Sequence, residues 1–216
     1  MPPLLTSPPD DPVPTAAQWL AAAAALGRRN ANAVALATAD TTGRPSVRMV
    51  LLKELAPAGY GVFYTHYGSR KAADLSATRR AAAVLYWHEL GRQIRFEGVV
   101  VRSPPAESDA YFATRPWRSQ LNAWSSEQSR PLDDPTELER RAATIAAERG
   151  VAAAGAAQRL PRPDFWGGYR LWFDAVELWV EGQDRFHERL RYERQLTRRD
   201  EHSFDAGHWL TQRLQP

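Results

Sequence analysis

The sequence predicts one mainly β domain, a small antiparallel barrel with helices packed outside it. Two observations support this fold class. Short apolar runs separated by turns containing Gly, Asp or Pro recur along the chain, and helix-type segments interrupt these runs without a regular alternation. The 216 residues, of which 44% are hydrophobic and eight are Trp, can fill one sizeable core.

The N-terminal third is expected to form a tail, a helix and a meander. Residues 1–14 are rich in Pro and are predicted to be disordered, with a single domain over residues 15–216. A first helix is expected from about Thr15 to Gly27. Three strands with hairpin turns should follow, at residues 33–39, 46–55 and 62–65.

The remaining two thirds should alternate strands with a helical middle. Pro116 and Pro131 are expected to break that middle, and residues 151–158 read as a loop or a frayed helix end. Helices are expected at residues 69–77, 105–115, around 117–124 and 135–150. Strands are expected at residues 82–90, 92–103, 169–182, 187–195 and 208–214.

Composition excludes several kinds of chemistry. The absence of cysteine rules out disulfides, thiolate catalysis and Cys-based metal sites, and the five histidines do not have a metal-binding spacing. No metal is therefore expected. The N-terminus lacks a signal peptide and no apolar run is long enough to span a bilayer, so a cytoplasmic protein with no membrane partner is expected.

One candidate anion site lies at the start of the helix expected at 69–77. Ser69 can cap this helix, and Arg70 and Lys71 follow it in the first turn, where cations oppose the helix dipole. A phosphate bound by the helix-end amides and the two cations would resolve this conflict. Lys53 and Lys71 are the only lysines among 28 basic residues, which suggests that both have a specific use. The alternative is two solvated surface charges.

A second candidate lies in residues 185–189. On a strand, Arg185, His187 and Arg189 would share one face, with Phe186 and Glu188 on the other. Three basic groups on one face favour an anionic or electron-rich ligand above them. A solvated outer strand face is about equally consistent with the pattern.

Two further sets contain polar groups in otherwise apolar or helical segments. Arg48 and Lys53 would lie on opposite faces of a regular strand, so one site can use both only through a bulge, a twist or a second subunit. Tyr111 and Arg115, one helical turn apart, lie near Ser119 and could bind a second phosphate, although from these residues alone an amphipathic helix with a half-buried Tyr is the preferred explanation.

Six ordered segments of the chain, together with its terminal RLQP, resemble the signature blocks of the pyridoxamine 5'-phosphate oxidase family. The blocks are RMVLLK (48–53), FYTHYGSRKAADL (63–75), RQIRFEG (92–98), YFATRPWRSQLNAWSSEQS (111–129), FWGGYR (165–170) and ELWVEGQDRFHERLRYER (177–194) with the chain end.

The resemblance implies an FMN-binding split β-barrel that forms a homodimer, with FMN at the subunit interface. Carried over position by position, the cofactor-binding residues would be Arg48, Met49, Val50, Tyr64, Thr65, Ser69, Arg70, Lys71, Gln93, Gln128, Ser129, Trp179 and Arg189. The substrate-binding residues would be Lys53, Tyr111, Arg115, Ser119, Arg185 and His187, of which Arg185 and His187 would also be catalytic.

The implied reaction oxidises pyridoxamine or pyridoxine 5'-phosphate to pyridoxal 5'-phosphate, with hydride transfer to the flavin and O₂ as the acceptor, giving H₂O₂. Two features depart from the family pattern. The N-terminal segment lacks the usual Arg and Tyr that close over the substrate, and Val180 and Glu181 replace the usual Gln-Gly after Trp179.

Two other functions remain open from the sequence. The same scaffold and FMN could serve an oxidase of the phenazine-biosynthesis type, to which the RFHER segment at 185–189 is also similar. A basic nucleic-acid-binding barrel is a third possibility, prompted by the many arginines. However, 25 acidic residues are interleaved with the 28 basic ones, so no nucleic-acid partner is expected.

Overall fold

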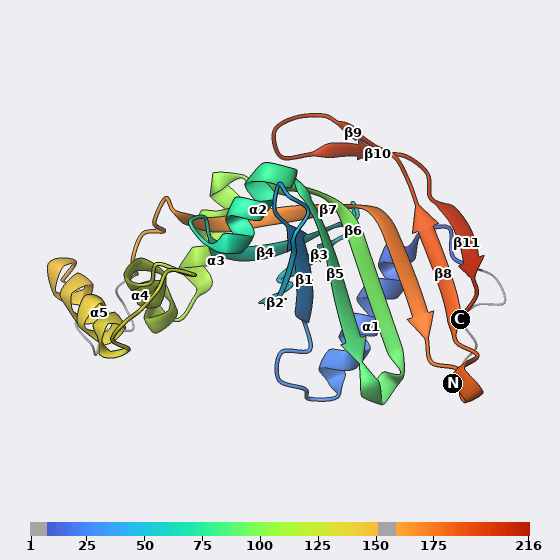
Figure 1. Ribbon diagram of the computed structural model, residues 1–216, viewed down its shortest axis with the longest axis horizontal. Helices are drawn as coiled ribbons and strands as arrows, with labels where there is room; N and C mark the ends of the chain where they lie inside the picture. Colours follow the sequence, from blue (N-terminus) through green and yellow to red (C-terminus); the bar gives the residue numbers. More distant parts are fainter. Residues whose placement is uncertain (1–7, 151–158) are drawn as a thin grey trace.

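The computed structural model describes residues 8–150 and 159–216, which form a bent antiparallel sheet with helices on its faces and at one end (Figure 1). Its helices are α1 (Pro12–Ala25), α2 (Arg70–Thr78), α3 (Pro105–Thr114), α4 (Trp117–Ser125) and α5 (Thr136–Glu148). Its strands are β1 (Ala33–Ala39), β2 (Pro45–Leu51), β3 (Glu54–Ala56), β4 (Tyr60–His66), β5 (Arg80–Trp87), β6 (Arg92–Arg102), β7 (Trp166–Val180), β8 (Glu188–Glu193), β9 (Leu196–Arg198), β10 (Phe204–Ala206) and β11 (Leu210–Leu214).

Strand β7 is the centre of the sheet. It pairs with the whole of β6 from Tyr169 to Val180, while its first half pairs with β4 and its second half with β8. The register between β6 and β7 shifts at Gly98, where a Cβ atom would lie 1.8 Å from the carbonyl oxygen of Trp172. This bulge bends the sheet so that its two arms, β6-β5-β1-β2 and β4-β3, curl toward each other.

The two arms meet without forming a ladder, which makes the barrel split. Strands β2 and β4 lie near each other but are not paired strands. At the closed end of this seam, the amide of Lys53 donates to the carbonyl oxygen of Val62 at 2.7 Å. The predicted split barrel is thus confirmed, and the open part of the seam is where a cavity forms.

The main core lies between α1 and the concave side of the sheet. Helix α1 contributes Val13, Ala16 and Trp19, which pack with sheet residues such as Phe96 and Leu178. Helices α3, α4 and α5 extend from one end of the sheet (Figure 1) and share a second core centred on Phe112 and Leu121. Helices α3, α4 and α5 therefore lie at one end of the seam.

Most predicted elements are present, with three corrections. Helix α1 begins at Pro12 and not at Thr15, because the Asp11 side chain caps the amide of Val13 at 2.9 Å. Val13 is buried, so the predicted disordered segment of residues 1–14 was drawn too long. Residues 1–7 of that segment, and the loop predicted at 151–158, lie outside the described residues.

The other two corrections concern strands. The strand predicted at 46–55 is interrupted after Leu51 and resumes at Glu54 as β3. The hairpin of β9 and β10 was missed, because each of its strands has only three residues, most of them exposed, and no alternating pattern can be read over so short a stretch.

Candidate functional site

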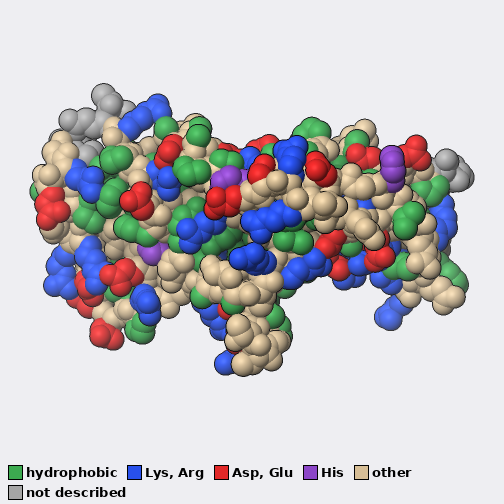
Figure 2. Space-filling model, turned by 90° about the horizontal axis from the view of Figure 1, so that it is seen from above, with side chains coloured by type: hydrophobic (Ala, Val, Ile, Leu, Met, Phe, Trp, Pro, Cys, Tyr) green, Lys and Arg blue, Asp and Glu red, His purple; other side chains and the backbone are tan. Residues whose placement is uncertain are grey.

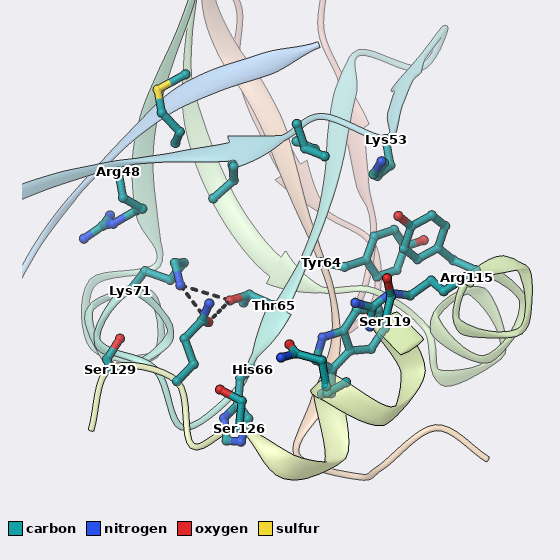
Figure 3. Close-up of a pocket in the computed structure, with 18 of the residues that line it drawn as sticks. Arg48, Lys53, Tyr64, Thr65, His66, Lys71, Arg115, Ser119, Ser126 and Ser129 are labelled. Atoms are coloured by element: carbon teal, nitrogen blue, oxygen red, sulfur yellow. Dashed lines mark hydrogen bonds between the residues drawn. The ribbon is translucent and has the colours of Figure 1, made fainter. Parts of the chain in front are cut away.

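A cavity of about 950 Å³ opens along the seam between β2 and β4 and reaches helices α2, α3 and α4. This volume is at the upper end of the usual range for ligand pockets. Thirteen of the predicted site residues line it, namely Arg48, Met49, Val50, Lys53, Tyr64, Thr65, Arg70, Lys71, Tyr111, Arg115, Ser119, Gln128 and Ser129. Figure 3 shows cations at both ends, with Arg48 and Lys71 at one and Lys53 and Arg115 at the other.

Lys71 is the central group of the first end. Its side chain is buried, and its Nζ donates to Thr65 Oγ1 at 3.1 Å, to Ser69 Oγ at 3.3 Å and to Gln128 Oε1 at 2.9 Å. All three acceptors are neutral. Burial, assisted by the nearby charge of Arg48, lowers the pKa of Lys71 to about 8. A buried ammonium without a carboxylate partner is suited to receive an anion.

Ser69 occupies the predicted N-cap position of α2, yet its side chain makes no capping bond. Its hydroxyl is fully buried and instead accepts a bond from Lys71. The first-turn amides of α2 are therefore left without a side-chain cap, close to the cations at this end. Arg70, the first residue of α2, also lines the cavity.

Arg48 is held by its neighbours on β1 and β2. Its guanidinium donates to Thr38 Oγ1 at 2.7 Å and to Ser46 Oγ at 2.8 Å, and it lies 3.8 Å from Asp74. Burial lowers the pKa of Arg48, although Asp74 opposes that shift. The arginine is thus oriented with only one distant acid, which leaves much of its charge for a ligand.

The break after β2 brings Arg48 and Lys53 to one cavity. Strict alternation would put them on opposite faces, but Leu52 and Lys53 lie between two strands. The amide of Leu52 bonds to the carbonyl oxygen of Asn32 at 2.9 Å, which fixes the turn. Both cations therefore line the same cavity within a single subunit.

The second end is built on an aromatic block, which we define as Tyr64, Tyr111 and Trp166. The Tyr64 and Tyr111 rings stack at 3.9 Å, and the Trp166 ring is nearly parallel to both, at 5.5 and 6.2 Å. Burial raises the pKa of Tyr64. The guanidinium of Arg115 lies over the Trp166 ring at 4.6 Å, and Lys53 Nζ is 5.8 Å from the Tyr111 ring centroid.

Glycines make room for this block. A Cβ atom on Gly168 would lie 2.5 Å from Ser103 Oγ and 2.9 Å from the Tyr64 ring, so a larger residue would displace the tyrosine. The side chain of Gln120, which is buried, donates to the carbonyl oxygens of Phe112 and Arg115 and so fixes the break between α3 and α4. Arg115 is thereby placed at the cavity wall.

Sequence reasoning missed part of the cavity wall. Trp166 lies within the FWGGYR block but had no assigned role, although an aromatic residue before two glycines is a possible signal of close packing. His66, Asn122 and Ser126 also line the cavity and were not predicted. Their polar side chains carry no local pattern that separates them from ordinary surface residues.

Six predicted residues do not line this cavity: Ser69, which accepts a bond from Lys71 beside it, and five residues that lie on β6, β7, β8 and the turn before β8. Gln93 on β6, Trp179 on β7 and Arg189 on β8 are in register across three neighbouring strands. Arg189 Nε donates to the buried carboxylate of Glu177 at 2.8 Å. The His187 ring lies 4.6 Å from the Trp179 ring, so these side chains form a second cluster.

The strand predicted at residues 187–195 is present as β8, but it does not extend back to Arg185. Strand β8 begins only at Glu188, and residues 183–185 form a 3₁₀ turn in which Asp184 and Arg185 have φ of 51° and 68°. The shared face of Arg185, His187 and Arg189 therefore does not exist as predicted. The turn is closed by Gly182, whose amide donates to His187 Nδ1 at 3.2 Å. Arg185 and His187 are instead carried by the turn that precedes β8.

The surface is of mixed charge. On the face shown in Figure 2, Lys and Arg side chains are interspersed with Asp and Glu and form no single basic stripe. Within residues 8–150 and 159–216, no helix has the length and apolarity needed to cross a bilayer. In the same ranges, no three His, Asp or Glu side chains converge in a way that would hold a metal ion.

Comparison with known proteins identifies the family. Residues 20–149 match the family model of pyridoxamine 5'-phosphate oxidase, and residues 166–216 match that of the pyridoxine 5'-phosphate oxidase C-terminal dimerisation region. A pyridoxine/pyridoxamine 5'-phosphate oxidase of Cereibacter sphaeroides is 44% identical over 207 residues, which is 96% of each chain. One of Rubrobacter xylanophilus is 44% identical over 206 residues, covering 95% of this chain and 87% of the relative.

Solved structures agree with this assignment. PhzG from Burkholderia lata, in complex with tetrahydrophenazine-1-carboxylic acid, is 36% identical with a TM-score of 0.83, covering 100% of this chain and 98% of PhzG. An FMN-binding protein of Nostoc punctiforme, related to pyridoxamine 5'-phosphate oxidase, shares the fold with a TM-score of 0.67 at 17% identity, covering 94% of this chain and 96% of that one. The chain belongs to the pyridoxamine 5'-phosphate oxidase family of FMN-dependent oxidoreductases.

Proposed function

We propose that this protein oxidises pyridoxamine 5'-phosphate or pyridoxine 5'-phosphate to pyridoxal 5'-phosphate, with O₂ as the acceptor and H₂O₂ as a product. The observation that carries this proposal is the presence of two separate cationic ends in one cavity, around Lys71 and around Arg115. A phosphorylated cofactor and a phosphorylated substrate together require two such ends. The names of the 44% identical relatives support the same substrates.

The first end fits the phosphate of FMN. Lys71 is buried among neutral acceptors, α2 begins beside it without a side-chain cap, and Arg48 and Arg70 add charge. These residues offer more positive charge than the nearby acid, Asp74, can balance. Tyr64, Thr65, Gln128 and Ser129 would complete the polar contacts of the cofactor, with Met49 and Val50 of β2 beside it.

The second end fits the phosphate of the substrate. Arg115 has a buried NH1 atom with no hydrogen-bond partner, and Lys53, Tyr111 and Ser119 line the same part of the cavity. Unpaired buried donors are costly, so a phosphate that accepts from them would be strongly favoured. No carboxylate of the described residues lies within ion-pair distance of Arg115 or Lys53.

The second cluster would complete the site from a partner subunit. Gln93, Trp179, Arg185, His187 and Arg189 do not line the cavity of their own subunit, and the C-terminal segment that carries four of them matches a dimerisation region. Phe186 between them is 77% exposed. In a two-fold dimer, each subunit would supply this cluster to the cavity of the other, and FMN would lie at the interface.

The residues of the chain would bind, orient and shield the reactants. Bound FMN supplies the acceptance of a hydride from the substrate and the transfer of the electrons to O₂. Lys53 and Arg115 hold the substrate phosphate, which fixes the distance of the ring from the cofactor. Arg185 and His187 of the partner subunit would contact the ring, and because Nδ1 of His187 accepts from Gly182, Nε2 of the neutral imidazole carries the hydrogen that it could donate to the substrate.

Turnover of the purified protein tests this proposal. The protein is reconstituted with FMN and mixed in air with pyridoxamine or pyridoxine 5'-phosphate, and pyridoxal 5'-phosphate and H₂O₂ are followed together. Equal amounts of both products are expected, with ammonia released from the amine substrate only. Bound flavin without turnover of either compound would overturn the proposed substrates.

A phenazine-type oxidase is the second candidate, favoured by the likeness to PhzG over the whole chain. Its ligand in that structure is a tricyclic carboxylic acid and has no phosphate. The two candidates therefore differ in whether the substrate ring carries a phosphate. An enzyme that turns over a phenazine precursor and ignores pyridoxamine 5'-phosphate would establish the second function instead.

A further inference from the structure

Arg115 lacks the carboxylate support that Arg170 and Arg189 have. Arg170 pairs with Glu107 and Arg189 with Glu177, each through a hydrogen-bonded carboxylate. Arg115 forms no such pair in the described part of the chain, its NH1 atom has no hydrogen-bond partner, and burial lowers its pKa. Some other group must hold this guanidinium at the cavity wall.

The Trp166 ring is that group. The guanidinium of Arg115 lies 4.6 Å from the ring centroid, which is within the range of a cation–π interaction. The Phe112 ring is farther away, at 5.6 Å, and Phe112 in turn packs edge-on against Trp166 at 5.1 Å. Trp166 therefore contacts both Arg115 and Phe112 of helix α3, which ends just before Arg115.

Trp166 cannot easily change its orientation. Only 6% of its surface is exposed, and its ring is nearly parallel to the Tyr64 and Tyr111 rings. Its backbone pairs with His66 in the ladder between β4 and β7. The indole is thus a rigid surface whose position is set by the sheet, while Arg115 extends from the end of a helix.

An aromatic face and a carboxylate would have different effects on anion binding. A carboxylate would orient Arg115 but would also compete with the incoming phosphate and neutralise the charge. The ring of Trp166 orients the guanidinium and leaves its N–H groups for a ligand. Lys53 follows the same pattern, since its ammonium lies near the Tyr111 ring of the same aromatic block.

We propose that Trp166 is a positioning residue for substrate recognition, which holds Arg115 in place for the phosphate of the substrate without consuming its charge. This inference rests on the proposed function. It adds a residue that acts through Arg115, and it makes the aromatic block part of the binding of an anionic substrate.

A double-mutant cycle on the FMN-loaded enzyme tests the role of Trp166. Trp166→Leu and Trp166→Phe are each combined with Arg115→Met, and KM and kcat for pyridoxamine 5'-phosphate are measured. With Arg115 present, Trp166→Leu should raise KM by about 3- to 30-fold with kcat within about twofold, and Phe should recover part of the loss. With Met at position 115, neither change at 166 should raise KM further.

Two controls separate this role from packing. Trp124→Leu removes a ring that lies 3.8 Å from the Arg149 guanidinium but does not line the cavity, and it should leave KM unchanged. FMN content and thermal unfolding are recorded for every variant. If Trp166→Leu does not fold, Trp166→Phe alone decides through its coupling to Arg115.

The outcomes are distinct. An equal rise of KM with Arg115 and with Met at 115, or a loss of kcat with KM unchanged, would overturn the role of Trp166 and leave the proposed function standing. A wild-type enzyme that neither binds nor oxidises pyridoxamine 5'-phosphate would remove both.

Discussion

At the residue scale, the assignment of the two phosphate ends is the first point to test. Arg115→Ala should raise KM for pyridoxamine 5'-phosphate by roughly 10- to 150-fold, because a hydrogen bond to a charged group contributes about 1.5–3 kcal/mol. Its FMN content should not change. Lys71→Met should instead lower FMN affinity, since it removes the central cation of the first end.

Fluorescence titration of FMN and steady-state kinetics on the two variants measure these effects side by side. If Arg115→Ala lost flavin while KM stayed constant, the two phosphates would have been assigned to the wrong ends.

Lys71 also predicts how FMN affinity depends on pH. Its pKa is lowered to about 8 in the protein without ligand, so the ammonium loses its proton as the pH rises above that value. The charged form is the one that attracts a phosphate, and FMN affinity should therefore drop by no more than about twofold up to about pH 8 and then fall progressively between about pH 8 and 10. Titrations across this range measure the slope.

The matched control for this pH effect is Lys71→Arg, which stays charged at all these pH values. Its FMN affinity should not fall between about pH 8 and 10, whatever its absolute value. The same decline in both proteins would assign the effect to another group.

At the scale of elements, the sequence predicted what local patterns determine. The helix at Arg70–Thr78 and the strand at Ala33–Ala39 were found because hydrophobic period and turn residues lie within a few positions. The break at Leu52 and the turn at residues 183–185 were missed, since each depends on contacts with distant strands or on left-handed residues that are not glycine. Contacts such as Arg115 with Trp166 join residues about fifty positions apart and carry no local signal.

The turn between β7 and β8 gives a prediction about Gly182. A Cβ atom at this position would lie 1.6 Å from the carbonyl oxygen of Phe186, so Gly182→Ala must open the turn and move His187. A shift of about 1 Å in a positioning residue can cost on the order of a hundredfold in rate. We expect kcat for pyridoxamine 5'-phosphate to fall by about 10- to 100-fold.

Gly207→Ala is the control for Gly182, because the nearest atom to its added Cβ is the carbonyl oxygen of Gln195 at 3.4 Å. It should keep kcat near that of the wild type. Unchanged turnover in Gly182→Ala would show that the turn does not position His187 for the reaction.

At the scale of the whole molecule, the predicted site residues form two clusters in different parts of the sheet. One lines the cavity between β2 and β4, and the other lies across β6, β7 and β8. The resemblance to the family predicted residues of both clusters and a site at the subunit interface, and the structure shows which of these residues one subunit does not bring together. A two-fold dimer in which each subunit completes the other's cavity accounts for this separation.

Mixed dimers test this arrangement. In a dimer of one Arg115→Ala and one His187→Ala subunit, one site would carry both defects and the other would carry neither, because Arg115 and His187 of one site come from different chains. Each variant alone should have little activity. Random reassembly of the two should restore about a quarter of the wild-type activity, since half of the dimers would have one intact site of two.

Mixing Arg115→Ala with Lys53→Ala gives the opposite expectation, because both residues line the same cavity of one subunit. Every site in those mixed dimers carries one defect, and no activity should return. Recovery in both mixtures, or in neither, would contradict a site shared between subunits, and His187 would then have to reach the cavity of its own chain by a movement of the turn that holds it.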